Sequence, residues 1–251
     1  MTTPTSTGMN RTGIQMSPIQ AGRLLEITEE RPSRPGEELT ELVQARESFY
    51  RESSPVGTVP PAGSMKGMAT TVLETIKGHK PTVLIDKLGE RLAFERTGVR
   101  LYEAVLTKLD ALGSWDGGPT REQLMQIRDE ELQHFQMLKE TIEGLGADPT
   151  AMTPSADITA VEGSGPLMVI SDPRTTLSQA LHSLLIIEAA DLEGWNLLIE
   201  LADQIGQSDM ADRFRAAEQT EQRHAMLVRQ WLTQSVKADA ERQMSSAQGG
   251  G

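Results

Sequence analysis

Two short patterns in the sequence could bind metal ions. Each is a Glu-x-x-His pair, Glu131 with His134 and Glu221 with His224. On a helix, side chains three residues apart project from the same face, so each pair can reach one point in space. Carboxylate oxygen and imidazole nitrogen both bind divalent transition metals. A single pair of this kind arises by chance in many surface helices, so the pattern becomes informative only together with further ligands.

Two further glutamates occupy matching places in an internal repeat. Glu95 and Glu188 are 93 residues apart, as are Tyr102 and Trp195, whereas the two Glu-x-x-His pairs are 90 residues apart. This spacing predicts two halves related by pseudo-two-fold symmetry. One Glu and one Glu-x-x-His from each half make up the ligand set of dinuclear carboxylate centres in helical bundles. We therefore predict six metal ligands: Glu95, Glu131, His134, Glu188, Glu221 and His224.

The charge of these side chains favours two divalent ions. Four carboxylates buried together repel one another, and each costs several kcal/mol of desolvation unless a positive charge compensates it. The chain contains no Cys, which excludes thiolate ligands, iron–sulfur clusters and disulfides. Carboxylates with imidazoles and open positions suit two Fe ions, with Mn or a mixed Mn/Fe pair as alternatives. A structural zinc would favour a closed tetrahedral set.

Four long helices would position these ligands. Apolar seams with helical period run through 82–112, from Thr120 to the glycines at 144 and 146, from Pro173 to Ile205, and from Met210 to Trp231. The predicted ligands interrupt the middle of each seam. Residues 146–172 are rich in Pro, Gly, Ser and Thr and lack this period, which indicates a long crossover connection. We predict an all-α fold, a four-helix bundle with one long crossover, which is the connectivity of ferritin-like proteins.

The rest of the chain extends this bundle at both ends. Residues 1–80 hold 9 basic and 9 acidic residues, are rich in Pro and lack enough apolar residues for a core. Short amphipathic helices are expected in this arm at 39–50 and 65–76. We divide the chain into an extended arm with short helices (1–80), the bundle (81–233) and a polar C-terminal tail (234–251).

Charge and hydropathy exclude several classes of partner. The net charge of -12 argues against nucleic acid, because a protein that binds phosphate backbones presents a basic face. No segment approaches the roughly 18 apolar residues of a membrane span, and the N-terminus lacks the apolar stretch of a secretory signal. We expect a cytoplasmic protein with neither a nucleic-acid nor a membrane partner.

Four segments resemble the ferritin-like di-iron carboxylate superfamily, with bacterioferritin and rubrerythrin as the nearest patterns: ERTGVRLY (95–102), EELQH (130–134), EAADLEGW (188–195) and EQRH (221–224). The resemblance places Asp191 where rubrerythrins carry an extra glutamate that can move onto the metal, and Tyr102 where they carry a tyrosine near the site. Because Asp is shorter than Glu, orienting a ligating His is an alternative to direct ligation for Asp191.

The resemblance implies an oxidoreductase of ferroxidase or peroxidase type, in which a di-iron site reacts with O2 or H2O2. Tyr102 and Trp195 would then gate or donate electrons, with core packing as their alternative role. A manganese catalase-like enzyme and a non-catalytic iron-binding stress protein are the alternative functions.

Two departures from these families also shape the expectations. Without Cys there is no rubredoxin-like module, so electrons would come from an external donor protein or from the substrate. The fifth helix of cage-forming ferritins has no clear counterpart, so we expect a small homo-oligomer such as a dimer. His79 and His182 are expected to be ordinary surface or packing residues. Three glutamates beside the seams are expected on solvated faces: Glu130, Glu193 and Glu218.

Overall fold

The computed structural model describes residues 37–53 and 81–248. The chain divides into two units, with α2 (Glu37–Glu52) in the first and the remaining described helices in the second. All regular structure in the described residues is helical, which confirms the all-α prediction for them. No described helix combines the length and the apolar character needed to cross a membrane.

Helix α2 coincides with the amphipathic helix expected at 39–50. Its apolar side chains Leu42, Val43, Phe49 and Tyr50 are exposed. The second short helix expected in the arm, at 65–76, lies outside the described residues, as does His79.

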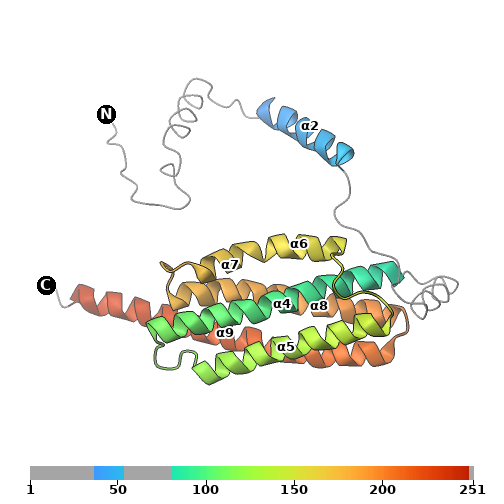
Figure 1. The fold of residues 1–251 in the computed structure, drawn as a ribbon. Helices are drawn as coiled ribbons and strands as arrows, with labels where there is room; N and C mark the ends of the chain where they lie inside the picture. The colour runs from blue at the N-terminus through green and yellow to red at the C-terminus, as the bar shows by residue number, and fades with distance from the viewer. Residues whose placement is uncertain (1–36, 54–80, 249–251) are drawn as a thin grey trace. The chain divides into compact units, whose positions relative to one another are not determined.

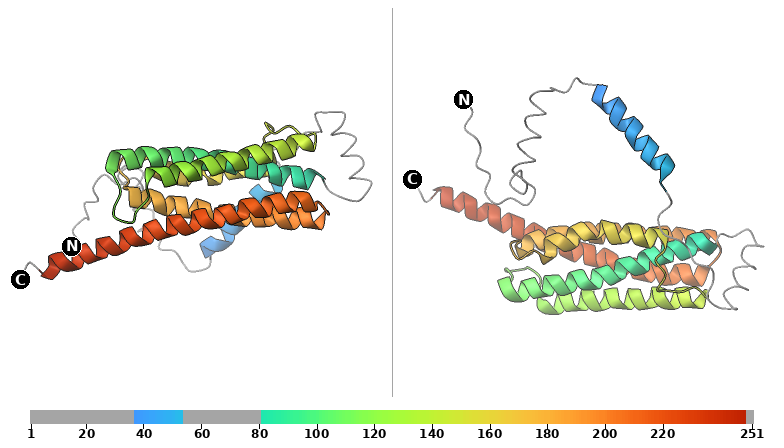
Figure 2. Two further views of the ribbon diagram at one scale, coloured as in Figure 1. Left: turned by 90° about the horizontal axis from the view of Figure 1, so that it is seen from below. Right: turned by 45° about the horizontal axis from the view of Figure 1, so that its top comes forward.

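The described residues of the second unit form six helices, and four of them are long (Figure 1). In chain order they are α4 (Pro81–Leu112), α5 (Arg121–Gly144), α6 (Pro154–Glu162), α7 (Ser164–Ser171), α8 (Leu177–Gln204) and α9 (Ser208–Gln248). Helix α4 packs against α5, α8 against α9, and α4 against α8, while α5 also contacts α9. The four long helices therefore lie side by side with their axes roughly aligned, as the two views of Figure 2 agree.

Local sequence signals explain where the long helices begin and end. Thr120 and Gln123 form the capping box expected at the start of α5, each side chain bonding to the other's backbone N–H. Gly146 and Gly206 follow α5 and α8 with φ of 79° and 73°. Glycine adopts this left-handed conformation without steric cost, so both helices end there.

The segment expected to be an irregular crossover contains two short helices instead. Thr153 caps α6 with Pro154 in its first turn, and α7 follows directly after Gly163. Helix α6 packs on α4 and α7 packs on α8, so the pair runs back along the length of the unit (Figure 1). These two helices show no apolar period in the sequence, because α6 spans only 9 residues and α7 only 8.

Helix α8 also begins four residues later than the expected start at Pro173. Asp172 accepts a hydrogen bond from the backbone N–H of Arg174, and the buried Lys108 donates to the carbonyl oxygens of Asp172 and Thr175. These bonds hold Pro173 in a turn, and a second capping box, between Thr176 and Gln179, starts the helix.

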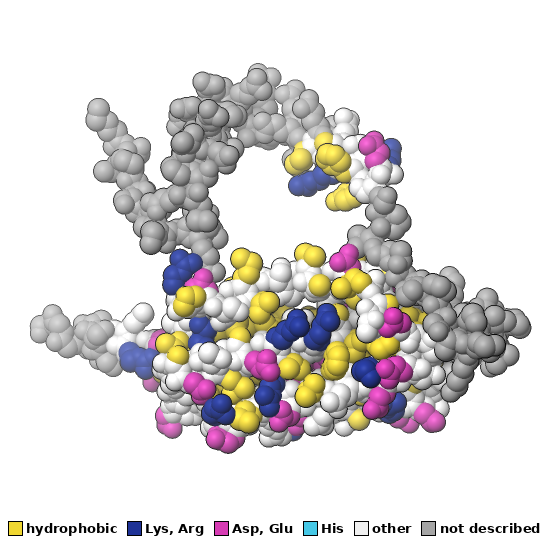
Figure 3. Space-filling model, viewed as in Figure 1, with side chains coloured by type: hydrophobic (Ala, Val, Ile, Leu, Met, Phe, Trp, Pro, Cys, Tyr) yellow, Lys and Arg dark blue, Asp and Glu magenta, His cyan; other side chains and the backbone are white. Residues whose placement is uncertain are grey.

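The expected polar tail, residues 234–251, continues α9 as far as Gln248. Its Ala, Lys, Glu, Arg and Gln residues are strong helix formers, and the buried Ser235 lies near the start of this segment. Charged side chains of both signs are interspersed with apolar ones on the face of the second unit that Figure 3 presents.

Two apolar clusters fill the interior of the second unit. One includes Leu101, Val105, Leu124 and Leu184, and the other includes Leu88, Leu138, Leu198 and Phe214. Both draw on all four long helices. The predicted ligands occupy the middle of the helices, between the two clusters.

The capping box of α8 provides a test of the fold. We expect Thr176→Ala to lower the free energy of unfolding by about 1 kcal/mol, because the N–H groups at the helix start lose their side-chain acceptor. Thr107→Ala is the control, because the hydroxyl of Thr107 is exposed and bonds only within its own helix. Urea unfolding of both variants measures the difference; equal stabilities would contradict the assigned start of α8.

Candidate metal centre

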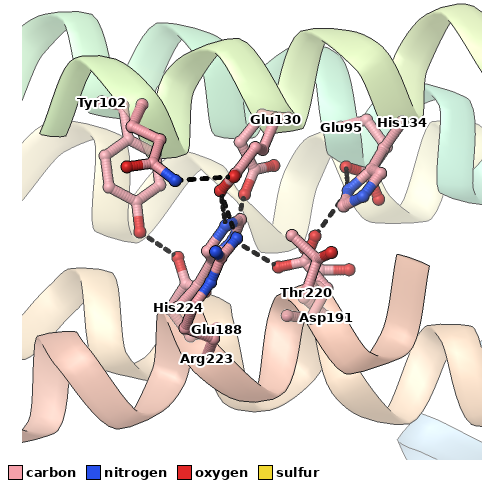
Figure 4. A network of polar contacts seen from close by, with 12 residues as sticks. Glu95, Tyr102, Glu130, His134, Glu188, Asp191, Thr220, Arg223 and His224 are labelled. Atoms are coloured by element: carbon pink, nitrogen blue, oxygen red, sulfur yellow. Dashed lines mark hydrogen bonds and ion pairs between the residues drawn. The ribbon is translucent and has the colours of Figure 1, made fainter. Parts of the chain in front are cut away.

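Seven polar side chains meet between the two apolar clusters. Helix α4 contributes one, and α5, α8 and α9 contribute two each, as Figure 4 shows for most of them. All are buried: Glu95, Glu131, His134, Glu188, Asp191, Glu221 and His224. The structure therefore brings the six predicted ligands together, with Asp191 beside them.

The donors form three overlapping groups. In the first, one atom each from Glu131, Glu188, Glu221 and His224 lies within 4.8 Å of the others. The same holds for Glu95, His134 and Glu221 in the second group, and for Glu95, Glu131, Asp191 and Glu221 in the third. Glu221 belongs to all three groups, and Glu131 belongs to two of them. Two adjacent positions that share a carboxylate are the arrangement expected of a dinuclear site.

Several donor atoms in these groups lack a hydrogen-bond partner among the described residues. They are Glu95 Oε2, Glu131 Oε2, His134 Nδ1, Glu188 Oε2 and Glu221 Oε1. His134 Nδ1 lies 2.6 Å from Glu221 Oε1, but the two atoms are not aligned for a hydrogen bond. Buried polar atoms are normally satisfied, so unpartnered lone pairs that converge on a common space fit a cation as the missing partner.

The imidazole of His224 is held from both sides. Its Nδ1 lies 2.9 Å from Glu221 Oε2 and faces the cluster, and its Nε2 lies 2.7 Å from Glu130 Oε2. Arg223 contacts the same oxygen of Glu130 at 2.7 Å. A ligating His commonly gives its second ring N–H to a carboxylate, which fixes the ring and its tautomer. Glu130 is thus placed to orient His224, and the expectation of a fully solvated Glu130 is wrong.

Tyr102 lies at the same end of the cluster. Its hydroxyl donates to Glu188 Oε1 at 2.5 Å, and the side chain is completely buried (Figure 4). Trp195, its counterpart in the repeat, stacks edge-on against His134 with 5.4 Å between ring centroids and also contacts Phe214. Tyr102 therefore contacts a predicted ligand through a hydrogen bond, whereas Trp195 contacts one through packing.

Arg91 joins Glu95 to Asp191. Its guanidinium group donates to Glu95 Oε1 at 2.7 Å and to Asp191 Oδ1, and all three side chains are buried. Asp191 therefore contacts a cation from α4 rather than a histidine, which differs from the suggested role of orienting a ligating His.

Gly98 leaves room for the cluster on α4. A Cβ atom at this position would lie 2.3 Å from Glu131 Oε2, so any larger residue would displace that carboxylate. The glycine is one turn beyond Glu95 and keeps the helix surface open where Glu131 extends.

Burial and mutual repulsion shift the protonation of the cluster. Burial raises the pKa of Glu188 to about 8 and that of Glu131 well above its usual range, and neighbouring carboxylates add to both shifts. Burial opposes the charged form of His134, but the nearby carboxylates of Glu221 and Glu95 raise its pKa to about 9. Without a metal, the cluster thus retains protons at neutral pH.

Sequence reasoning missed Arg91 and Glu130. Arg91 is four residues before Glu95 and so on the same face of α4, a signal that could have been used. Glu130 lies next to Glu131 and off the seam, and only the approach of α9 brings it to His224. His182 is exposed, as one of the two ordinary roles expected for it, surface or packing, requires.

No protein-family model, curated protein or solved structure matches this chain.

The shifted groups predict how the metal-free protein responds to pH. Glu188 and His134 have folded-state pKa values, about 8 and about 9, above their ordinary 4.5 and 6.5, so the folded state binds more protons than the unfolded state between these limits. Stability should therefore fall as the pH rises from about 4.5 to about 9. The lowered pKa of Glu221, about 2, acts only below this window.

Thermal unfolding midpoints in chelator across this pH range measure the effect. Glu188→Gln removes one of the titrating groups and should flatten the decline, whereas Asp212→Asn, an exposed substitution on α9, should leave the slope unchanged. Midpoints that rise with pH would contradict the assigned proton uptake.

Proposed function

We propose that the chain is a dinuclear metal protein of ferritin-like architecture, most simply a di-iron oxidoreductase that reacts with O2 or H2O2. The observation that carries the proposal is the set of unpartnered donor atoms at Glu95, Glu131, His134, Glu188 and Glu221. They come from all four long helices and are sealed between two apolar clusters. The return path of α6 and α7 between the two helix pairs supports the ferritin-like interpretation.

The balance of charge supports two divalent ions. Five carboxylates, those of the four predicted ligands and Asp191, are buried together with Arg91 as the cation in contact with them. When all five are ionised, Arg91 leaves four negative charges uncompensated, which two divalent ions would neutralise. A single ion would leave a net charge in an interior where charge is costly.

The donor set supports iron or manganese. Carboxylates outnumber imidazoles two to one among the predicted ligands, and Glu221 belongs to every donor group. Bound iron would supply Lewis acidity and one-electron chemistry toward O2 or H2O2. Zinc would offer no redox chemistry.

The surrounding residues would prepare the site for this chemistry. Glu130 fixes the ring of His224 so that Nδ1 faces the cluster, and Tyr102 holds Glu188 through its hydroxyl. The two apolar clusters limit the access of water from either end. These contacts make the donor positions depend little on whether an ion is bound, which favours tight binding.

The test is anaerobic loading of the metal-free protein with Fe(II), followed by metal analysis and then by O2 or H2O2. We expect two Fe per chain and fast oxidation, followed in the absorbance spectrum, that repeats when a reductant is added. One slow, stoichiometric oxidation would instead favour iron binding without catalysis. Release of O2 from H2O2 by Mn(II)-loaded protein would favour a catalase-like activity, and failure to retain any metal would overturn the proposal.

Variants of the shared ligands test the arrangement of the two ions. We expect Glu221→Ala and Glu131→Ala each to lower occupancy at both positions, since these glutamates are placed to bridge them. Glu218→Ala, a half-buried position on α9 outside the donor groups, is the control and should retain two ions. Two ions retained in Glu221→Ala would contradict the shared carboxylate.

Gly98→Ala provides a test in which no ligand is changed. Its added Cβ would meet Glu131 Oε2 at 2.3 Å, so we expect metal affinity to fall by about tenfold or more. Gly144→Ala is the matched control, because a Cβ there meets nothing within 4 Å. Metal analysis after dialysis measures the difference, and unfolding of the metal-free variants checks that folding is retained. Undiminished metal content in Gly98→Ala would contradict the position given to Glu131.

A further inference from the structure

The two halves of the cluster are related by the repeat but are not equivalent. Glu95 corresponds to Glu188 and His134 to His224, yet Gly98 corresponds to Asp191, 93 residues further along the chain. One half therefore has a glycine, without a side chain, at the position where the other half has a buried carboxylate. Arg91 on α4 compensates this extra negative charge through an ion pair with Asp191.

Arg91 occupies a space made for it. A Cβ atom at Gly194 would lie 2.3 Å from Arg91 Nη1 and 2.9 Å from its Cδ, so only glycine admits the guanidinium group at that point. The guanidinium carbon lies 4.3 Å from the centre of the Phe94 ring and 5.5 Å from that of Trp195. Both rings are close enough to stabilise the charge of the guanidinium group.

Arg91 also binds one oxygen of a predicted ligand. Its guanidinium group donates to Glu95 Oε1 at 2.7 Å, and the other oxygen of that carboxylate, Oε2, lies 3.7 Å from His134 Nδ1. The corresponding carboxylate in the other half, Glu188, accepts a hydrogen bond from the neutral hydroxyl of Tyr102 instead. Hence a full positive charge adjoins one half of the cluster, and a neutral donor adjoins the other.

The number of donors differs in the same direction. The group around Glu188 and His224 has four donor residues, whereas the group around Glu95 and His134 has three. Asp191 is close enough to Glu95, Glu131 and Glu221 to act as a further donor, but its Oδ1 accepts from Arg91. Fewer donors and an adjacent cation both weaken the binding of a second cation.

We propose that Arg91 is a positioning residue that holds Asp191 out of the coordination sphere and makes the Glu95–His134 position the weaker of two metal positions, filled second. This inference rests on the proposed dinuclear centre and adds an order of filling to it. Arg91 compensates the negative charge of Asp191, which a metal ion would otherwise have to compensate.

The experiment is a titration of the metal-free, full-length protein with Co(II), followed by its visible absorption bands and by calorimetry. We expect two steps in the wild-type protein, with dissociation constants separated by about tenfold or more. Arg91→Met should tighten the second step by at least about tenfold, because it removes the competing charge and releases both Glu95 Oε1 and Asp191. The absorption of the second ion should change with the new ligand.

Three other variants separate the effect of charge from that of structure. Arg91→Lys retains the charge and should keep two separate steps. Asp191→Asn leaves Arg91 uncompensated, and the second step should weaken by about tenfold. Arg96→Met removes an exposed charge from the same helix and should leave both steps unchanged.

The outcomes distinguish this inference from the proposed function. Two ions bound with equal affinity in the wild-type protein would overturn the role of Arg91 and leave the dinuclear centre standing. Failure to bind Co(II) at all would overturn both. If Arg91→Met does not fold, Asp191→Asn decides: an unchanged or tighter second step would overturn the inference, and a weaker one, with Arg91→Lys still showing two steps, would support it.

Discussion

The main constraint on this structure is the electrostatic repulsion among carboxylates that are buried in one place. Removing a charged group from water is costly, and the cost rises when like charges share the same space. Apolar clusters on both sides of the centre prevent water from screening these charges. The surrounding side chains therefore act as charge compensation: protons retained on glutamates, imidazoles beside Glu221, and one guanidinium group. Each compensates part of the charge, and a metal ion held by the oxygens without a hydrogen-bond partner could compensate the rest.

Long helices suit this task because they carry their own backbone hydrogen bonds into the interior. A loop at the same depth would add unsatisfied N–H and C=O groups to an already costly centre. With the donors at mid-helix, the only polar groups to be satisfied there are side chains. The small residues Gly98 and Gly194 fit the same requirement, since they admit a carboxylate and a guanidinium group without bending the helices that carry them.

Much of the centre could be predicted from sequence because helical period and an internal repeat are both one-dimensional signals. Glu131 and His134 share a face by spacing alone, and the repeat assigns Glu95 to Glu188. The outer partners could not be found in this way: Glu130 meets His224 only through the packing of α5 on α9. The short helices α6 and α7 could not be predicted because they span too few turns for an apolar period to emerge. The late start of α8 could not be predicted either, because it depends on Lys108, which is distant in sequence.

The position of Glu130 has a consequence for how the centre exchanges protons. Its side chain is 18% exposed, and it accepts from the completely buried His224, whose other nitrogen bonds to Glu221. In the metal-free centre, a continuous hydrogen-bonded path therefore runs from the shared carboxylate to the solvent through one imidazole, which can take up a proton on one nitrogen and release one from the other. Until an ion occupies His224 Nδ1, this path crosses an otherwise apolar boundary. Ionisation of the cluster need not wait for helices to separate or for water to enter.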